Sequence, residues 1–527
     1  MSKHIDNGFI KTKYGVVATS EPNAAYAGLD ILKKGGNAID AAIATAAALT
    51  VTEPTSNGIG GDNFAIIWHQ NELIGMHSSG RTPELLSIDE LNKRGLKEIP
   101  THGFIPVTVP GAVKGWVELS KKYGKLEFKE LLEPAIKLAE KGYKIAPTVR
   151  SNWEKAYQIY EKKFDHLMFD HWFETFGQVP KENGVVTLKD HAKTLKEIAL
   201  TSGDSFYYGK LAQQIHDFSI KHHGFIRKSD LEKHQVDWVK PIKTNYRGYD
   251  IFELPPNTQG IIGLMGLNIL ENFDMQKLSP LDAYHASIES IKLAFSDGLN
   301  YIADPRYMNV TTDELLSKTY AKHRFQEIKD HAIIPTCGNP KSTGTVYLST
   351  ADNDGNMVSF IQSNYMGFGS GLVVPQTGIS LQNRGHNLSL DPKSANFIGP
   401  NKKTYHTIIP GFITKDNKPI GPFGVMGGFM QPQGHLQVVS SYIDYLLSPQ
   451  ESLDKPRFQW IKDKTIYVEP SLDKKIIDGL KSKGHDVIIQ KDLGHFGRGQ
   501  MIVKTHEGFI VGTEKRCDGT IAYKEQK

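Results

Sequence analysis

Residues 339–365 read NPKSTGTVYLSTADNDGNMVSFIQSNY, and the interpretation of the whole chain starts from this stretch. It begins as a loop of proline, glycine and polar residues and changes at Thr345 into a run of strand-forming residues. A second such run starts at Asn356, and the segment from Asp352 to Gly355 separates the two runs. Two β-rich runs joined by an Asp-Gly turn predict an antiparallel hairpin whose first strand begins at Thr345.

The residues before this hairpin alternate between strand and helix signals. A strand-like segment at 15–19 precedes helical segments at about 24–34 and 38–49. Glycines at 56–63 then predict a tight loop before a strand at 64–69. The N-terminal part is therefore expected to contribute strands as well as helices.

The middle of the chain is mainly helical. Helical periodicity runs through residues 111–142, and the charged, aromatic segment 151–237 is typical of an outer helical layer. A strand-like segment at 245–256 precedes two long amphipathic helices at 261–273 and 283–302.

The residues after the hairpin alternate strands with helices at 434–447 and 473–483. Antiparallel hairpins with helices outside them are typical of layered architectures. The predicted fold class is therefore an α/β (α+β) layered sandwich, not a doubly wound parallel sheet.

The composition is that of a globular protein. The 527 residues carry a formal net charge of +4 with acids and bases interspersed, so we expect no nucleic-acid partner. Cys337 and Cys517 form no CxxC pair, which suits a reducing compartment. The N-terminus has no signal-peptide pattern, and the apolar run at 41–51 is too short to span a bilayer. We therefore expect a cytoplasmic protein without a membrane partner.

The common catalytic and metal-binding motifs do not occur. The sequence has no Walker loop and no HExxH, and its histidines do not cluster at a metal-ligand spacing, so no metal site is predicted. Residues 367–371 (GFGSG) are similar to a nucleophile elbow, but the serine comes one position too late and no helix follows.

A cut between Gly344 and Thr345 would create a nucleophile. Thr345 would then carry a hydroxyl and a free α-amino group, which titrates near pH ~8 and can accept the hydroxyl proton. Gly344 leaves the backbone free to strain while the hydroxyl attacks the preceding carbonyl. Most Gly-Thr pairs at a strand start are only structural, because threonine is a preferred strand residue.

A second candidate element is the segment 424–428 (GVMGG). The consecutive glycines Gly427 and Gly428 precede Pro432 and an apolar helix. Glycines before a helix can turn two backbone N–H groups toward an anion, and the helix dipole assists them. An oxyanion hole needs this arrangement, although an ordinary strand-to-helix turn is the commoner reason for such a pattern.

Further blocks follow one another along the chain: AGLDILKKGGNAIDAAIATAAALTVTEPTSNGIGGDNF from Ala27, VPGAVKGW from Val109, SIKLAFSDGLNYIADP from Ser290 and GVMGGFMQPQGH from Gly424. Together with Thr345 and its hairpin, they resemble the γ-glutamyltranspeptidase (glutathione hydrolase) family over nearly the whole chain. The blocks NYMGFG, QNRG and YHTIIP look closer to the branch with γ-glutamyl hydrolase-like and cephalosporin acylase-like proteins.

The resemblance implies an αββα sandwich and a proenzyme that cuts itself into residues 1–344 and 345–527. It also implies acyl transfer through a threonine ester, from a γ-glutamyl amide to water or an amine. No metal or organic cofactor is implied. The expected partners are a small amide substrate and the second chain from the same precursor, with further dimerisation open.

The resemblance also implies roles for individual residues. Thr345 corresponds to the nucleophile, and Ser363 to a hydroxyl residue that hydrogen-bonds it. Gly427 and Gly428 correspond to the oxyanion pair. Arg81 corresponds to the arginine that binds the substrate α-carboxylate, for which a bidentate guanidinium is well suited.

Five positions depart from the well-studied transpeptidases. Asn387 stands where an aspartate binds the α-amino group, His406 and Thr407 replace two serines, Tyr365 replaces an asparagine, and Arg384 replaces a glutamine. The loss of the aspartate removes a partner for an ammonium group, while Arg384 and His406 are expected to add positive charge. We therefore expect an acyl group that carries a carboxylate and makes little use of an α-ammonium group. The short segment after Asn387 also suggests room for larger leaving groups.

Three hypotheses follow for the function. The first is an amidohydrolase and acyltransferase acting on γ-glutamyl amides such as glutathione. The second keeps this machinery for glutaryl, oxamoyl or other carboxylate-bearing amides. The third is an uncleaved binding protein without catalysis, which the joint presence of Thr345, Ser363, Gly427, Gly428 and Arg81 disfavours.

Overall fold

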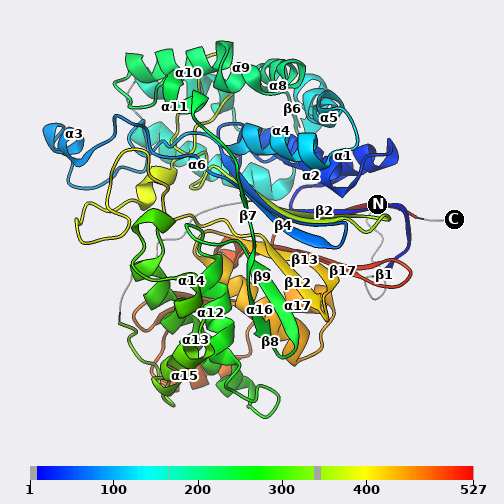
Figure 1. The fold of residues 1–527 in the computed structure, drawn as a ribbon, viewed down its shortest axis with the longest axis vertical. Helices are drawn as coiled ribbons and strands as arrows, with labels where there is room; N and C mark the ends of the chain where they lie inside the picture. The colour runs from blue at the N-terminus through cyan, green and yellow to red at the C-terminus, as the bar shows by residue number, and fades with distance from the viewer. Residues whose placement is uncertain (1–8, 165–166, 337–345, 526–527) are drawn as a thin grey trace.

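The computed structural model describes residues 9–164, 167–336 and 346–525. Within these ranges, two seven-stranded antiparallel sheets lie face to face between two layers of helices (Figure 1). This is the layered αββα arrangement predicted from the sequence. The expected cleavage site, Gly344 and Thr345, lies outside the described residues, as does Cys337.

The first sheet contains the predicted hairpin. Its strand order is β19-β2-β10-β11-β3-β4-β7. These strands are β2 (Thr12–Thr19), β3 (Asp62–His69), β4 (Glu72–Ser78), β7 (Asp237–Val239), β10 (Val346–Asp352), β11 (Met357–Ser363) and β19 (Thr520–Glu525). One sheet therefore contains strands from both sides of the expected cut, with β10 and β11 inserted between β2 and β3.

The second sheet has the order β1-β18-β17-β13-β12-β9-β8. These strands are β1 (Phe9–Ile10), β8 (Ile242–Tyr246), β9 (Tyr249–Glu253), β12 (Gly411–Lys415), β13 (Lys418–Met426), β17 (Arg498–Lys504) and β18 (Phe509–Thr513). Strands β10 and β11 of the first sheet pack against β13 of the second, so the core between the sheets lies beneath the hairpin.

The hairpin has the predicted geometry. Val346 pairs with Gln362, and the Asp352 N–H donates to the Asn356 carbonyl at 3.0 Å. Gly355 occupies the turn with φ +93°, a conformation that side chains rarely adopt. The Asp-Gly signal therefore predicted both the turn and the strand pairing.

Helices α1 (Pro22–Lys33) and α2 (Ala38–Thr52) cover the first sheet. Every residue of α2 is buried, which explains its run of alanines. Gly28 allows the two helices to approach closely, since a Cβ at this position would lie only 2.2 Å from the Thr45 hydroxyl. Helix α4 (Ala112–Tyr123) packs beside α2 on β3 and β4. The other helices of this layer are α5 (Phe128–Lys141), α6 (Pro147–Lys163), α7 (Asp170–Phe176), α8 (Lys189–Thr201), α9 (Asp204–Tyr207), α10 (Lys210–Lys221) and α11 (Lys228–Glu232).

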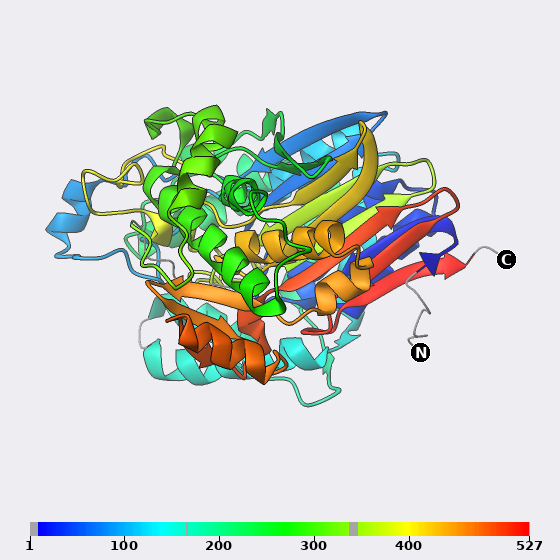
Figure 2. The same ribbon diagram turned by 90° about the horizontal axis from the view of Figure 1, so that it is seen from below.

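Helices α12 (Gly260–Leu270), α13 (Pro280–Tyr301) and α16 (Met430–Asp444) cover the second sheet, as Figure 2 shows from the helical side. The first two agree with the predicted segments within a few residues. Helix α16 begins four residues earlier than expected, because Pro432 fits into a first turn, where its missing N–H has no helical partner to lose.

The remaining elements are short and peripheral. They are α3 (Ile88–Lys93), α14 (Thr312–Leu315), α15 (Lys318–Gln326), α17 (Pro449–Asp454), α18 (Lys474–Ser482), β5 (Tyr143–Lys144), β6 (Val185–Val186), β14 (Phe458–Lys462), β15 (Thr465–Val468) and β16 (Asp486–Ile489). None of the helices in the described ranges has the length and apolar character needed to cross a bilayer.

Candidate active site

The end of β11 brings two of the predicted site residues together. Ser363 is fully buried, and its hydroxyl oxygen accepts a hydrogen bond of 2.7 Å from the Tyr365 N–H. Tyr365 has φ +79° and is only 1% exposed. An aromatic residue in this backbone region is strained, and such strain is often found where a site has to be positioned.

The end of β13 holds the predicted oxyanion glycines. Gly427 and Gly428 have φ values of +135° and +57°, and their carbonyls accept from the N–H groups of Met430 and Gln431 in the first turn of α16. The glycine pair therefore forms the junction between a central strand and a buried helix. Its position at a helix N-terminus suits the stabilisation of an anion.

Gln259, which the sequence reasoning did not single out, holds the glycine pair to the segment around His406. Its side-chain Nε2 donates to the carbonyls of Thr407 at 2.6 Å and Gly428 at 2.8 Å. Its Oε1 accepts from the Tyr405 hydroxyl at 2.9 Å. The only signal in the sequence was its place shortly after the strand-like segment at 245–256.

Arg384 forms the centre of a buried polar group. Its Nη1 donates to the Thr407 hydroxyl at 2.7 Å, and the guanidinium carbon lies 4.3 Å from the centre of the Tyr365 ring. The side chain is 1% exposed, and its Nε and Nη2 make no hydrogen bond with any described residue. Burial lowers the pKa of Arg384 to about 10, so the group stays charged at neutral pH.

Asn387 is joined to the same group. Its Oδ1 accepts a short hydrogen bond from the Tyr365 hydroxyl, and its Nδ2 donates to the Tyr405 carbonyl at 2.9 Å. Both polar ends of the Asn387 side chain therefore have a partner within the protein, and the side chain carries no negative charge with which to pair an ammonium group.

Asp62 is a second residue that the sequence reasoning missed. Its carboxylate accepts from His406 Nε2 at 3.1 Å and from the Gly111 N–H at 3.2 Å, and both side chains of the His406–Asp62 pair are fully buried. Burial raises the pKa of Asp62 to about 7, against the opposing effect of Arg384. The signal available was an aspartate between the glycine loop and the strand at 64–69.

This pair corrects the charge expected of the pocket. His406 was expected to add positive charge, but burial and the nearby Arg384 lower its pKa well below the usual value. His406 is therefore neutral, and Asp62 places a carboxyl group within range of the Arg384 charge. Arg384 is the source of positive charge in this group.

Arg81 lies outside this network. Its Nη1 pairs with Asp304 Oδ2 at 3.0 Å, and the side chain is 34% exposed. Asp304 Oδ2 also accepts from the Lys403 N–H at 2.9 Å, so the arginine is linked to the segment that carries His406. Among the described residues, no direct contact joins the Arg81 side chain to Arg384 or His406.

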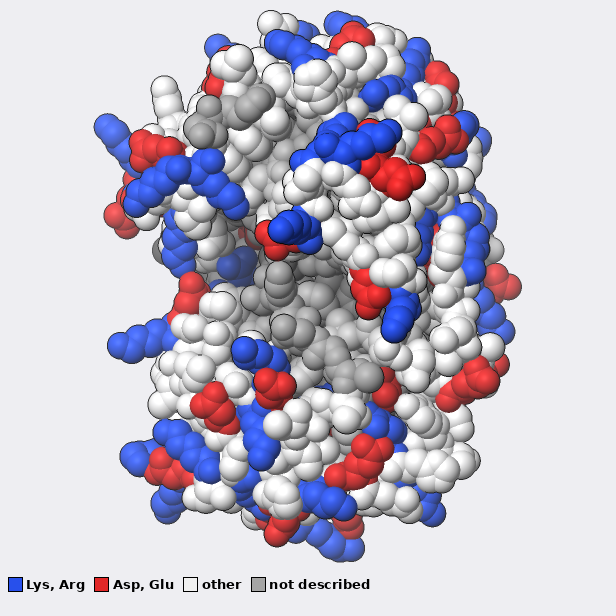
Figure 3. Space-filling view, turned by 90° about the vertical axis from the view of Figure 1, so that its left-hand side faces the viewer, with Lys and Arg blue, Asp and Glu red and all other residues white. Residues whose placement is uncertain are grey.

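Two cavities lie beside these residues. One of about 440 Å³ is lined by Tyr365, Asn387, Tyr405 and Phe429 among others, and one of about 290 Å³ is lined by Gly427 and Gly367 among others. The face drawn in Figure 3 is hollowed near its middle, and its charged side chains of both signs are scattered.

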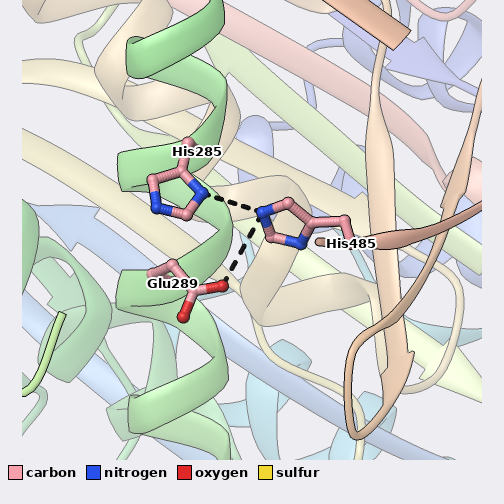
Figure 4. Close-up of side chains that lie close together, drawn as sticks. All are labelled: His285, Glu289 and His485. Carbon is pink, nitrogen blue, oxygen red and sulfur yellow. Dashed lines mark hydrogen bonds and ion pairs between the residues drawn. The ribbon is translucent and has the colours of Figure 1, made fainter. Parts of the chain in front are cut away.

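A separate buried cluster contains His285, Glu289 and His485, the described set with possible metal-ligand geometry (Figure 4). The two histidines are joined at 2.8 Å, and Lys292 Nζ lies 2.7 Å from Glu289 Oε1. The lysine already balances the carboxylate charge. The cluster is therefore accounted for as a hydrogen-bonded network that fixes residues 329–333 through the Lys329 carbonyl and the Ile333 N–H.

Comparisons with known proteins agree over nearly the whole chain. The family model described as Gamma-glutamyltranspeptidase matches residues 24–524. The glutathione hydrolase-like YwrD proenzyme of Bacillus subtilis is 35% identical over 94% of this chain and 96% of its own length. The oxamate amidohydrolase proenzyme of Klebsiella pneumoniae is 31% identical over 97% of this chain and 98% of its own.

Among solved structures, the cephalosporin acylase from Bacillus halodurans superimposes with a TM-score of 0.96. It is 50% identical to this chain, and the alignment covers 100% of this chain and 98% of that structure.

Proposed function

Because the chain belongs to the gamma-glutamyltranspeptidase family, we propose that it is a self-cleaving threonine amidohydrolase acting on γ-glutamyl amides such as glutathione. The acyl group would pass through an ester with Thr345 to water, or to an amino acid or peptide amine. The proposed division is a large chain of residues 1–344 and a small chain of residues 345–527.

The strand register around the hairpin is the observation that carries this proposal. Val346, which follows Thr345 in the chain, pairs with Gln362, which precedes Ser363. The end of β11 that carries Ser363 therefore lies opposite the start of β10, whose first residue directly follows the proposed nucleophile in the sequence. The positive φ values of Gly427 and Gly428 and their place just before the N-terminus of α16 support the assignment of an oxyanion hole to this segment.

The reaction needs no group beyond these residues. The free α-amino group of Thr345, with a pKa near ~8, takes the hydroxyl proton while the oxygen attacks the amide carbonyl. The Gly427 and Gly428 N–H groups would stabilise the tetrahedral oxyanion. The C–N bond then breaks, the amine nitrogen takes the proton, and the ester remains. Water or a second amine then attacks the ester carbonyl and gives a proton to the α-amino group. The ester C–O bond breaks, the Thr345 oxygen takes that proton, and the free acid or the new amide leaves.

Arg384 favours a second candidate acyl group. Its buried Nε and Nη2 form a fork without a hydrogen-bond partner among the described residues, and such a fork binds a carboxylate in a bidentate manner. Asn387 offers little to an ammonium group. Glutaryl amides, which carry the carboxylate without the ammonium, are therefore the alternative substrates, and the similarity to a cephalosporin acylase structure agrees with this choice.

The first experiment is an intact-mass measurement with N-terminal sequencing, repeated on Thr345→Ala and Thr345→Ser. Wild type is expected to give two pieces, the smaller beginning at Thr345. Thr345→Ala should stay in one piece without activity, while Thr345→Ser keeps a hydroxyl and should still be cut. A wild-type chain that stays whole on long incubation would favour the non-catalytic binding protein instead.

The acyl group is tested with a pair of p-nitroanilides, γ-glutamyl and glutaryl, on the cleaved enzyme. A higher kcat/KM for the γ-glutamyl compound supports the first candidate, and a higher value for the glutaryl compound supports the second. Cleaved protein that hydrolyses neither would contradict both.

A further inference from the structure

The cavity of about 290 Å³ beside Gly427 has no role in the chemistry described above. It begins at one proposed oxyanion glycine, and the larger cavity with Tyr365 and Asn387 is a separate one. Both parts of the chain contribute to its wall: Thr55 and Lys155 come from before the expected cut, and Asp492 and Arg498 from after it. Its volume lies near the lower limit of small-molecule sites.

Arg498 is the main cationic group of this wall. Its side chain is 12% exposed, and Nη1 lies 3.5 Å from the buried Glu53 Oε1. Apart from this long ion pair, its guanidinium makes no hydrogen bond with the described residues. Glu53 is turned toward another partner as well, since its Oε2 accepts from the Ser20 hydroxyl at 2.6 Å. Most of the guanidinium N–H groups are therefore available to a ligand.

Two further groups complete a polar site. Lys155 and Asp492 both line the cavity and form an ion pair, with Nζ 2.9 Å from Oδ2 and both side chains more than half exposed. The Thr55 hydroxyl is buried and has no hydrogen-bond partner among the described residues. A buried hydroxyl without a partner is costly unless a ligand or water occupies the space beside it.

We infer that this cavity binds the amine part of the substrate, and that Arg498 and Lys155 bind the carboxylate of that amine. The site would take α-amino acids and short peptides with a free C-terminal carboxylate, first as the leaving amine and then as the acceptor. Arginine suits this task because its fork pairs with both carboxylate oxygens. This inference rests on the proposed function, since it assigns the second half of the same substrate.

The test compares two substrates with one acyl group: a γ-glutamyl or glutaryl dipeptide with a free C-terminal carboxylate, and the same compound with a C-terminal amide. The cleaved wild-type enzyme should prefer the free acid. In Lys155→Met and Arg498→Gln, the ratio of kcat/KM for acid over amide should fall about tenfold, as expected for a lost charged hydrogen bond.

Two controls keep the result specific. Lys137→Met removes another exposed, ion-paired lysine, on α5 away from the cavity, and should leave the ratio unchanged. Arg498→Lys keeps a positive charge opposite Glu53 and should retain part of the wild-type preference for the acid over the amide. A folded Arg498→Lys enzyme with an intermediate preference would show that the loss in Arg498→Gln is a loss of binding and not a failure to fold.

The outcomes distinguish the inference from the proposed function. If wild type turns over the acid and the amide equally, or if the variants lose kcat/KM equally on both, the inference is wrong but the proposed amidohydrolase activity is not affected. Cleaved protein that turns over neither compound would overturn both.

Discussion

At the scale of single residues, burial decides the electrostatics of the candidate site. Arg384 and His406 are both basic residues in the sequence, yet only Arg384 keeps its charge, because burial beside an arginine keeps the imidazole neutral. Asp62 adds a buried carboxyl group that the sequence analysis did not single out. The network around Tyr365 therefore combines the buried cation of Arg384 with the buried acid of Asp62.

Arg384→Gln tests whether this cation selects the acyl group. The substitution removes the guanidinium fork, so kcat/KM for the glutaryl p-nitroanilide should fall about 10- to 100-fold, the range of one charged hydrogen bond. The γ-glutamyl compound should lose less if its ammonium group contributes to binding elsewhere. Equal losses on both substrates would mean that Arg384 only supports Tyr365 and Thr407.

Asp62→Asn tests the buried acid through the pH dependence of stability. The pKa of Asp62 rises from 3.8 to about 7 on folding, so the folded protein binds the proton more tightly than the unfolded chain. Its contribution to stability is therefore full below about pH 4 and is lost as the pH rises toward 7. Relative to Asp62→Asn, the wild type should lose at least about 1 kcal/mol across this window.

Urea unfolding at three pH values within this window measures the difference. Asp391→Asn, which changes an exposed aspartate, serves as the matched control and should follow the wild type. If the free energies of unfolding of wild type and Asp62→Asn change with pH in the same way, the Asp62 carboxyl group is ionised throughout this window. Its hydrogen bonds would then lower its pKa by more than burial raises it.

At the scale of elements, α13 fixes the last described residues before the expected cut. Lys292 and Glu289 are fully buried on this helix, and the Glu289 carboxylate accepts from the Ile333 N–H. His285 adds a hydrogen bond to the Lys329 carbonyl. The segment 329–333 is therefore held against a core helix, and its nearest residue, Ile333, precedes Thr345 by 12 positions.

Lys292→Met tests this network. The variant leaves Glu289 buried without its cation, which should lower the free energy of unfolding by about 3–5 kcal/mol. The double variant Lys292→Met with Glu289→Gln removes the unpaired charge and should recover part of the loss. Thermal melts of both variants measure the effect, and a single variant as stable as wild type would mean that Glu289 is neutral in the fold.

At the scale of the whole molecule, the strand order predicts how the two chains behave after the cut. In the first sheet, β10 and β11 from after the cut lie between β2 and β3 from before it. In the second, β12 from after the cut pairs with β9 from before it. Separating the chains would break backbone hydrogen bonds in both sheets and expose the core between them.

The cleaved protein should therefore remain one unit under native conditions. Size-exclusion chromatography should give a species of 58.7 kDa or a multiple of it, while denaturing gels show two pieces. Because the two chains share both sheets, they should unfold together in a single thermal transition. Recovery of the smaller piece alone from a native column would contradict the interleaved sheets.

The sequence by itself determined the features that depend on neighbouring residues. The hairpin at 346–363, helices α12 and α13 and the glycine pair before α16 follow from local turn chemistry and periodicity, so their positions were predicted within a few residues. The family could also be recognised from the sequence, because each matching block is a run of neighbouring residues and its recognition needs no tertiary contact.

Only the tertiary structure decided which side chains meet. Asp62 and His406 are separated by 344 positions, and Gln259 joins Thr407 and Gly428 from 148 and 169 positions away. Nothing in local sequence fixes such contacts, because they depend on how two sheets and their helices pack. The neutral state of His406, the Arg384 fork that has no hydrogen-bond partner among the described residues, and the cavity beside Gly427 all result from that packing, since burial and the distance between charges are properties of the folded chain.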